Sequence, residues 1–122
     1  MTQLDRRFDP RIPFETYLTA YMEDRPVRGF TVNISETGLY LNTLPDSLAR
    51  PTMVMGLELS LPGVPETIWA AGTLCYGTED AYFLGQGVRF TAMAQRHAEL
   101  VRRFCYRLRR ETLRDSQTDF SA

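Results

Sequence analysis

Two arginines near the N-terminus are the first residues whose type and spacing suggest chemistry. Arg7 and Arg11 lie four positions apart within residues 6–13. Pro10 and Pro13 bias the residues before them toward an extended backbone, which disfavours a helix. Four extended steps of about 3.3 Å place the two Cα atoms up to roughly 13 Å apart, so the two guanidinium groups can grip different parts of one extended polyanion. The alternative for this segment alone is a solvated basic tail.

A second candidate site is the segment NISETG at residues 33–38, which follows a predicted strand. Asn33 and Ser35 are two positions apart, so we expect their side chains to project to one side and to offer an acceptor and a hydroxyl to one planar partner. Gly38 can adopt a positive φ and would let that partner approach the backbone. The alternative is an ordinary β-turn.

Residues typical of catalysis or metal binding are scarce. The single histidine, His97, falls on the apolar side of a predicted helix, so we expect a buried or capping residue. Cys75 and Cys105 have no neighbours at metal-ligand spacing, and we expect both to be small buried hydrophobic residues. The sequence contains no nucleophile–histidine arrangement and no glycine-rich phosphate loop before a helix. We therefore predict a protein that is not an enzyme and that holds no metal or cofactor.

The two polar segments together resemble a known family. Residues 7–11, RFDPR, match the RxxxR motif of the PilZ domain, the bacterial receptor module for the second messenger cyclic di-GMP. Residues 33–38 match its [D/N]xSxxG motif in the family's order. Further similarity lies in the strand after the glycine, in the strand end LSLP at 59–62 and in GQGVRF at 85–90, so the resemblance covers about residues 6–108.

The resemblance implies a binding site for cyclic di-GMP. Arg7 and Arg11 would clamp its phosphates and guanine O6/N7 edges, while Asn33, Ser35 and Gly38 would meet a guanine from the barrel surface. This chemistry is reasonable because an arginine fork matches both phosphate oxygens and the O6/N7 pair. Asn33 is the neutral option where many members have aspartate, so we expect a weaker contact to the guanine N–H groups.

The resemblance also suggests roles for two more residues. Arg6 directly precedes the motif, as in members that bind an intercalated ligand dimer, so we predict two nucleotides per site. Tyr76 ends a predicted strand where some members place a residue beneath a base, and its ring could stack on the ligand. The alternative for Tyr76 is ordinary surface packing.

These residues need a framework, and the sequence pattern predicts that it is mainly β. Six segments alternate apolar and polar residues and are separated by short polar, proline or glycine turns. They span residues 14–22, 27–34, 39–41, 53–61, 67–76 and 81–90. An open sheet of six short strands would expose its edges, so we expect a closed barrel. The resemblance implies the same six-stranded antiparallel PilZ-like β-barrel with a C-terminal α-helix.

The period changes after residue 90, where His97, Val101, Phe104 and Leu108 share one helical face. We predict one domain in four parts. These are a mobile N-terminal arm (1–13), the barrel (14–90), a C-terminal helix (91–115) and a frayed tail (116–122).

Length and charge limit the remaining possibilities. A chain of 122 residues has room for one domain. No apolar run approaches the roughly 18 residues needed to span a bilayer, and residues 1–10 are too charged for a signal peptide, so we predict a cytoplasmic protein with no membrane insertion. The net charge of −1 and an acidic middle section argue against a nucleic-acid-binding barrel.

Two functions remain. The first is a cyclic di-GMP receptor whose arm orders over the ligand and changes a surface recognised by an unidentified protein partner. The alternative is a nucleotide-independent adaptor of the same fold that acts through the basic stretch 102–114 of its C-terminal helix. The sequence leaves open whether the protein is a monomer or a dimer.

Overall fold

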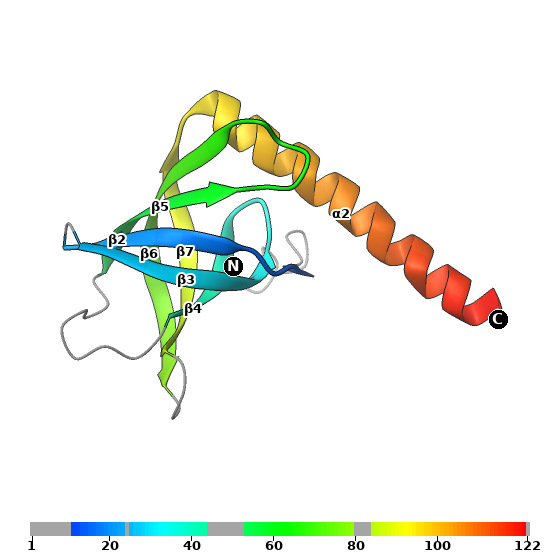
Figure 1. Cartoon of the computed structure of the whole chain (residues 1–122), viewed down its shortest axis with the longest axis horizontal. Coiled ribbons are helices and arrows are strands. Elements are labelled where there is room, and N and C mark those ends of the chain that lie inside the picture. The colour runs from blue at the N-terminus through cyan, green and yellow to red at the C-terminus, as the bar shows by residue number, and fades with distance from the viewer. Residues whose placement is uncertain (1–10, 24, 44–52, 80–83, 122) are drawn as a thin grey trace, which may run out of the picture.

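The computed structural model describes residues 11–23, 25–43, 53–79 and 84–121, which form seven strands and one long helix (Figure 1). The strands are β1 (Ile12–Pro13), β2 (Tyr17–Met22), β3 (Arg25–Ile34), β4 (Gly38–Thr43), β5 (Val54–Ser60), β6 (Thr67–Glu79) and β7 (Leu84–Met93). The helix is α2 (Gln95–Ser121).

The sheet closes on itself. Its strand order is β1-β3-β2-β5-β6-β7-β4, and β4 pairs back with β3, so six strands form a closed ring to which β1 adds at β3. Every pairing is antiparallel. This arrangement confirms the predicted six-stranded antiparallel barrel with a C-terminal helix.

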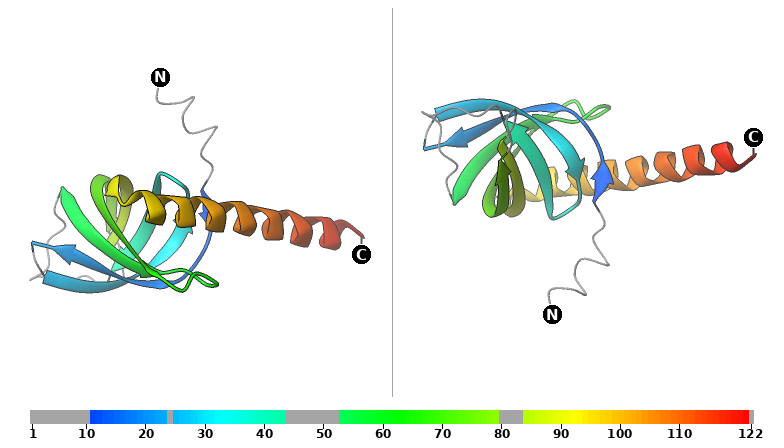
Figure 2. Two further views of the ribbon diagram at one scale, coloured as in Figure 1. Left: turned by 90° about the horizontal axis from the view of Figure 1, so that it is seen from above. Right: turned by 90° about the horizontal axis from the view of Figure 1, so that it is seen from below.

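Alternating side chains of the strands fill the barrel. On β2, β4 and β5 every second residue is buried, as the period of two requires. The helix adds Val101, Phe104 and Cys105 to the same core. Phe104 also meets Phe14 edge to face, with 4.9 Å between the ring centroids. Beyond this contact, α2 extends well past the barrel (Figures 1 and 2).

The barrel sheet contains three register shifts; one lies between Ala71 and Gly72 of β6, and the other two are bulges that change which residues of β3 and β6 face outward. The first interrupts the β3–β4 register between Thr31 and Asn33. Thr31 and Ile34 are both buried, and Val32, which the alternation placed on the same face as Ile34, is 36% exposed. The second bulge lies between Leu74 and Tyr76 in the β6–β7 register. Cys75 is exposed there, so the prediction of a buried Cys75 is wrong, whereas Cys105 is buried as predicted.

The predicted segment boundaries need correction at both ends of the barrel. Residues 12 and 13, predicted as part of a mobile arm, form β1 and pair with Ile34 and Asn33. Strand β6 continues to Glu79, where the sequence predicted a loop from residue 77, because it still pairs with β7 as far as Leu84.

The helix also differs from its predicted range of 91–115. It begins at Gln95, since residues up to Met93 still pair with β6. It reaches Ser121, into the stretch predicted as a frayed tail. Because no glycine or proline occurs between residues 95 and 121, no residue in this stretch breaks the helical hydrogen bonds. No helix among the described residues is long and apolar enough to cross a membrane.

His97 attaches the start of α2 to the barrel. The backbone N–H of Trp69 donates a hydrogen bond of 3.2 Å to Nδ1 of His97. Glu66 lies 3.6 Å from Nε2 of the same ring and forms an ion pair with Arg96. These contacts join the β5–β6 connection, β6 and the first turn of the helix.

Strands β4 and β7 approach each other very closely at Gly38. A Cβ atom at this position would lie 2.2 Å from the carbonyl oxygen of Val88. The turn motif suggested a positive φ at Gly38, but among the described residues the glycine with a positive φ is Gly63. Gly38 is therefore required by the close approach of β7 and not by its own backbone conformation.

We expect Gly38→Ala to lower the free energy of unfolding by about 1–3 kcal/mol, because the new methyl group would force β4 and β7 apart. Urea denaturation measures this change. Gly56→Ala is the matched control, since a Cβ atom there would make an ordinary contact of 3.7 Å with Tyr21. Equal effects of the two substitutions would contradict the steric argument.

The Glu66 ion pair predicts a pH dependence of stability. The hydrogen bond and the charge of Arg96, with a smaller effect of His97, hold the pKa of Glu66 below its ordinary value of 4.5. A carboxylate whose pKa is lower in the folded state than in the unfolded state stabilises the fold at pH values above its unfolded-state pKa. This stabilisation is lost as the pH falls through the folded-state pKa. We expect Glu66→Gln to lower the melting temperature at pH 7 and the difference from wild type to shrink below pH 4.5. Glu15→Gln, which removes an exposed carboxylate elsewhere, should not show this pattern.

Candidate functional site

A row of residues crosses four neighbouring strands on the outer face of the barrel. Asn33 on β3 lies opposite Tyr40 on β4, Tyr40 lies opposite Gly87 on β7, and Gly87 lies opposite Tyr76 on β6. The residues on either side of Tyr40 and of Gly87 are buried in the barrel: Leu39, Leu41, Gln86 and Val88. Because side chains alternate along a strand, this row points away from the core.

The two bulges create this row. Thr31 points into the barrel, so in a regular strand Asn33 would point inward as well. The extra residue Val32 turns Asn33 outward. In the same way, Cys75 separates the partly buried Leu74 from Tyr76 and aligns Tyr76 with Gly87.

Arg11 reaches the row from the arm. Its Nη1 donates a hydrogen bond of 3.4 Å to Oδ1 of Asn33. The pairing of β1 with the end of β3 holds Arg11 in place, since Pro13 lies opposite Asn33. The last arginine of the first predicted segment and the first residue of the second are thus in direct contact. Arg6 and Arg7 lie outside the described residues.

Two tyrosine rings form the aromatic part of the site. The rings of Tyr40 and Tyr76 have centroids 5.8 Å apart and are tilted by 34°. A Cβ atom at Gly87 would lie 2.3 Å from the Tyr76 ring, so the ring covers this glycine. Tyr76 is nevertheless 49% exposed. The rings offer an apolar surface on which a planar base can stack.

Tyr40 was not among the predicted site residues. Its signal in the sequence is an aromatic residue between two core leucines, which an alternating strand must present on the outside. Its position beside Asn33 depends on the register of β3 and β4. That register includes the bulge, and the residue pattern does not reveal it.

Ser35 forms the turn between β3 and β4. Its Oγ accepts hydrogen bonds of 3.2 Å from the backbone N–H groups of Thr37 and Gly38. The side chain is buried, with 1% of its residue surface exposed. The hydroxyl therefore stabilises the turn instead of standing on the surface beside Asn33, as the two-residue spacing suggested.

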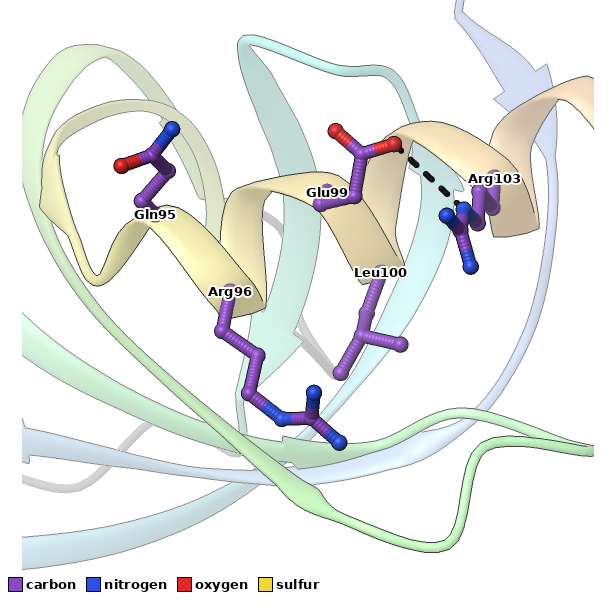
Figure 3. Close-up of a pocket in the computed structure, with 5 residues that line it drawn as sticks. All are labelled: Gln95, Arg96, Glu99, Leu100 and Arg103. Atoms are coloured by element: carbon purple, nitrogen blue, oxygen red, sulfur yellow. Dashed lines mark ion pairs between the residues drawn. The ribbon is translucent and has the colours of Figure 1, made fainter.

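The basic side of α2 lies apart from this row. Its first turns carry a shallow pocket lined by Gln95, Arg96, Glu99, Leu100 and Arg103. Figure 3 shows Glu99 facing Arg103, and their ion pair measures 3.4 Å. Glu99 also pairs with Arg102. Acidic partners thus balance much of the positive charge in this part of the helix.

The described residues contain no group of three or more histidine, cysteine, aspartate or glutamate side chains that could hold a metal ion.

Comparison with known proteins places these features in a family. A model of the PilZ domain family matches residues 5–107. A solved structure described as that of the Bacillus subtilis inhibitor of motility (MotI/DgrA) superposes with a TM-score of 0.73 at 17% sequence identity. The match covers 87% of this chain and 52% of that one, so the chain spans about half the length of this structural neighbour. No curated protein matches the chain.

The structural neighbour supports the fold, and the family match spans the arm, the barrel and the helix as far as Arg107. The protein belongs to the PilZ domain family.

Proposed function

We propose that this protein is a receptor for cyclic di-GMP, which binds where the root of the arm meets the outer row of the barrel. The observation that best supports this function is the hydrogen bond between Arg11 and Asn33. It joins the two family motifs in space, although 22 positions separate the residues in sequence. PilZ domains are ligand-binding effector domains, so we propose that the protein acts by binding and not by catalysis.

The groups of the row complement the parts of the dinucleotide. The Arg11 guanidinium can donate two parallel hydrogen bonds to a phosphate or to the O6/N7 edge of a guanine. The amide of Asn33 can accept from guanine N–H groups. Tyr40 and Tyr76 offer ring faces to a base. In this proposal Ser35 and Gly38 act by holding the turn and the strand beneath the ligand.

The arm completes the site. Arg7 would provide a second guanidinium group that binds the phosphates. Arg6 would support the binding of a second, intercalated nucleotide. Ordering of the arm over the ligand would change the surface around β1, and Phe14 just beyond β1 packs against Phe104 of the helix. The neighbouring structure is described as an inhibitor of motility, and an inhibitor acts on another component. We propose that this protein likewise acts on a protein partner, in the bacterial cytoplasm.

Isothermal titration calorimetry of cyclic di-GMP at a fixed salt concentration tests this function. We expect saturable binding to the wild type, and we expect Arg7→Ala/Arg11→Ala to weaken it about a hundredfold or more, because two charge-assisted hydrogen-bonding groups are lost. A stoichiometry near two nucleotides per chain would support the role proposed for Arg6.

Arg28→Ala serves as the control, since this exposed arginine lies over the Tyr17 ring on the β2–β3 hairpin and its loss should leave binding intact. Absence of binding in the wild type, with no competition by any guanine nucleotide, would contradict the receptor function. It would favour an adaptor that works through its basic helix.

Tyr76 provides a separate test of the aromatic surface. We expect Tyr76→Ala to weaken cyclic di-GMP binding about tenfold and Tyr76→Phe to retain it, because the ring face and not the hydroxyl would contact the base. Calorimetry measures both affinities. A thermal melt of each variant checks that loss of the ring over Gly87 has not unfolded the barrel. Equal affinities of the alanine variant and the wild type would exclude stacking on Tyr76.

A further inference from the structure

Arg89 lies on the same outer face as the proposed nucleotide site. It is located on β7 and pairs with Gly38 of β4 on one side and with Thr73 of β6 on the other. Val88 is fully buried, so its neighbours Gly87 and Arg89 both face outward. Arg89 is therefore two positions along the strand from the glycine that lies beneath the Tyr76 ring.

The backbone of Arg89 is held firmly against the second motif. A Cβ atom at Gly38 would lie 3.2 Å from the Cα atom of Arg89. The next residue, Phe90, donates its backbone N–H to the carbonyl oxygen of Thr37 at 2.7 Å. The base of the Arg89 side chain thus has a fixed position relative to the turn that Ser35 stabilises. A side chain on such a rigid strand can contribute to a precisely placed contact.

The Arg89 side chain has no partner in the described part of the chain. It is exposed, and no hydrogen bond, ion pair or ring contact engages its guanidinium group. The arginines at the start of α2 differ, because Arg96, Arg102 and Arg103 all pair with carboxylates. The five N–H donors of Arg89 are available to an anion that lies over Tyr40 and Gly38.

Arg11 and Arg89 both lie toward the β3–β4 turn from this row, because Arg11 precedes Ile12, which pairs with Ile34, and Arg89 pairs with Gly38. Arg11 binds Asn33 on β3, and β7 is two strands away, which corresponds to about 10 Å between strand axes. A ligand that stacks on the tyrosines therefore has two guanidinium groups along one side of it. Cyclic di-GMP carries two phosphates, so a second cation beside Arg11 can bind the phosphate that Arg11 does not contact.

We propose that Arg89 is a further ligand-binding residue, which donates two hydrogen bonds to a phosphate of the bound dinucleotide. This inference rests on the proposed function and adds a contact outside both motif segments. It assigns Arg89 to a phosphate rather than to a base edge, so its effect should depend on salt.

The test is calorimetric titration of cyclic di-GMP at several salt concentrations into the wild type and into Arg89→Ala, Arg89→Lys and Arg28→Ala. We expect Arg89→Ala to weaken binding about tenfold and to make the affinity less dependent on salt, because one of the charges that attract the dianionic ligand is lost. Arg89→Lys should recover part of the affinity, since lysine keeps the charge without the planar fork. Arg28→Ala, which removes the same charge from the β2–β3 hairpin, should match the wild type.

The outcomes separate this inference from the receptor function. If the wild type binds and Arg89→Ala binds equally well, the Arg89 contact is wrong and the receptor function stands. A weaker affinity with an unchanged salt slope would also overturn the phosphate contact. If the wild type does not bind cyclic di-GMP, the function and the inference both fail. Thermal melts establish that the exposed substitutions leave the fold intact.

Discussion

Closure of the barrel through β4 is the constraint on which the rest of the structure depends. This short strand pairs with β3 on one side and with β7 on the other. Glycines occur where the backbones come closest: a Cβ atom at Gly29 would lie 2.7 Å from the carbonyl oxygen of Asn42, and one at Gly38 would lie 2.2 Å from that of Val88. Because both neighbours hold β4 this closely, its register is fixed, and Tyr40 lies between Asn33 and Gly87. The outer row is a consequence of how the ring closes.

The sequence pattern predicted the number of barrel strands, because the alternation of apolar and polar residues follows from which face of each strand is buried. It did not predict the bulges, which depend on the register between strands. The bulges at Val32 and Cys75 differ from the predicted pattern: Val32 is exposed where alternation placed it with Ile34, and Cys75 is exposed where we expected a buried thiol. These two positions are also the ones that turn Asn33 and Tyr76 onto a common face. Two of the three register shifts in the sheet therefore lie at the candidate site.

The motif resemblance named Arg11 and Asn33 as site residues, and the structure brings these two residues into contact. It could not distinguish a residue that faces the surface from one that shapes the backbone beneath it. Ser35 illustrates the difference, because its hydroxyl accepts two backbone N–H groups of its own turn. Tyr40 illustrates the reverse, since it belongs to neither motif and stands directly beside Asn33. Residues on four different strands form this site, so the spacing of residues along the chain does not predict which of them lie side by side.

The root of the arm is the point where the site and the helix meet. Ile12 is buried in the core and pairs with Ile34, while the adjacent Arg11 contacts Asn33 on the outside. Phe14 donates its backbone N–H to Val32, the extra residue of the first bulge, and packs its ring against Phe104 of α2. The path from Asn33 to the helix is therefore a short series of direct contacts through β1 and Phe14. Arg11 thus adjoins a strand whose buried Ile12 belongs to the same packed cluster as Val101, Phe104 and Cys105 of the helix.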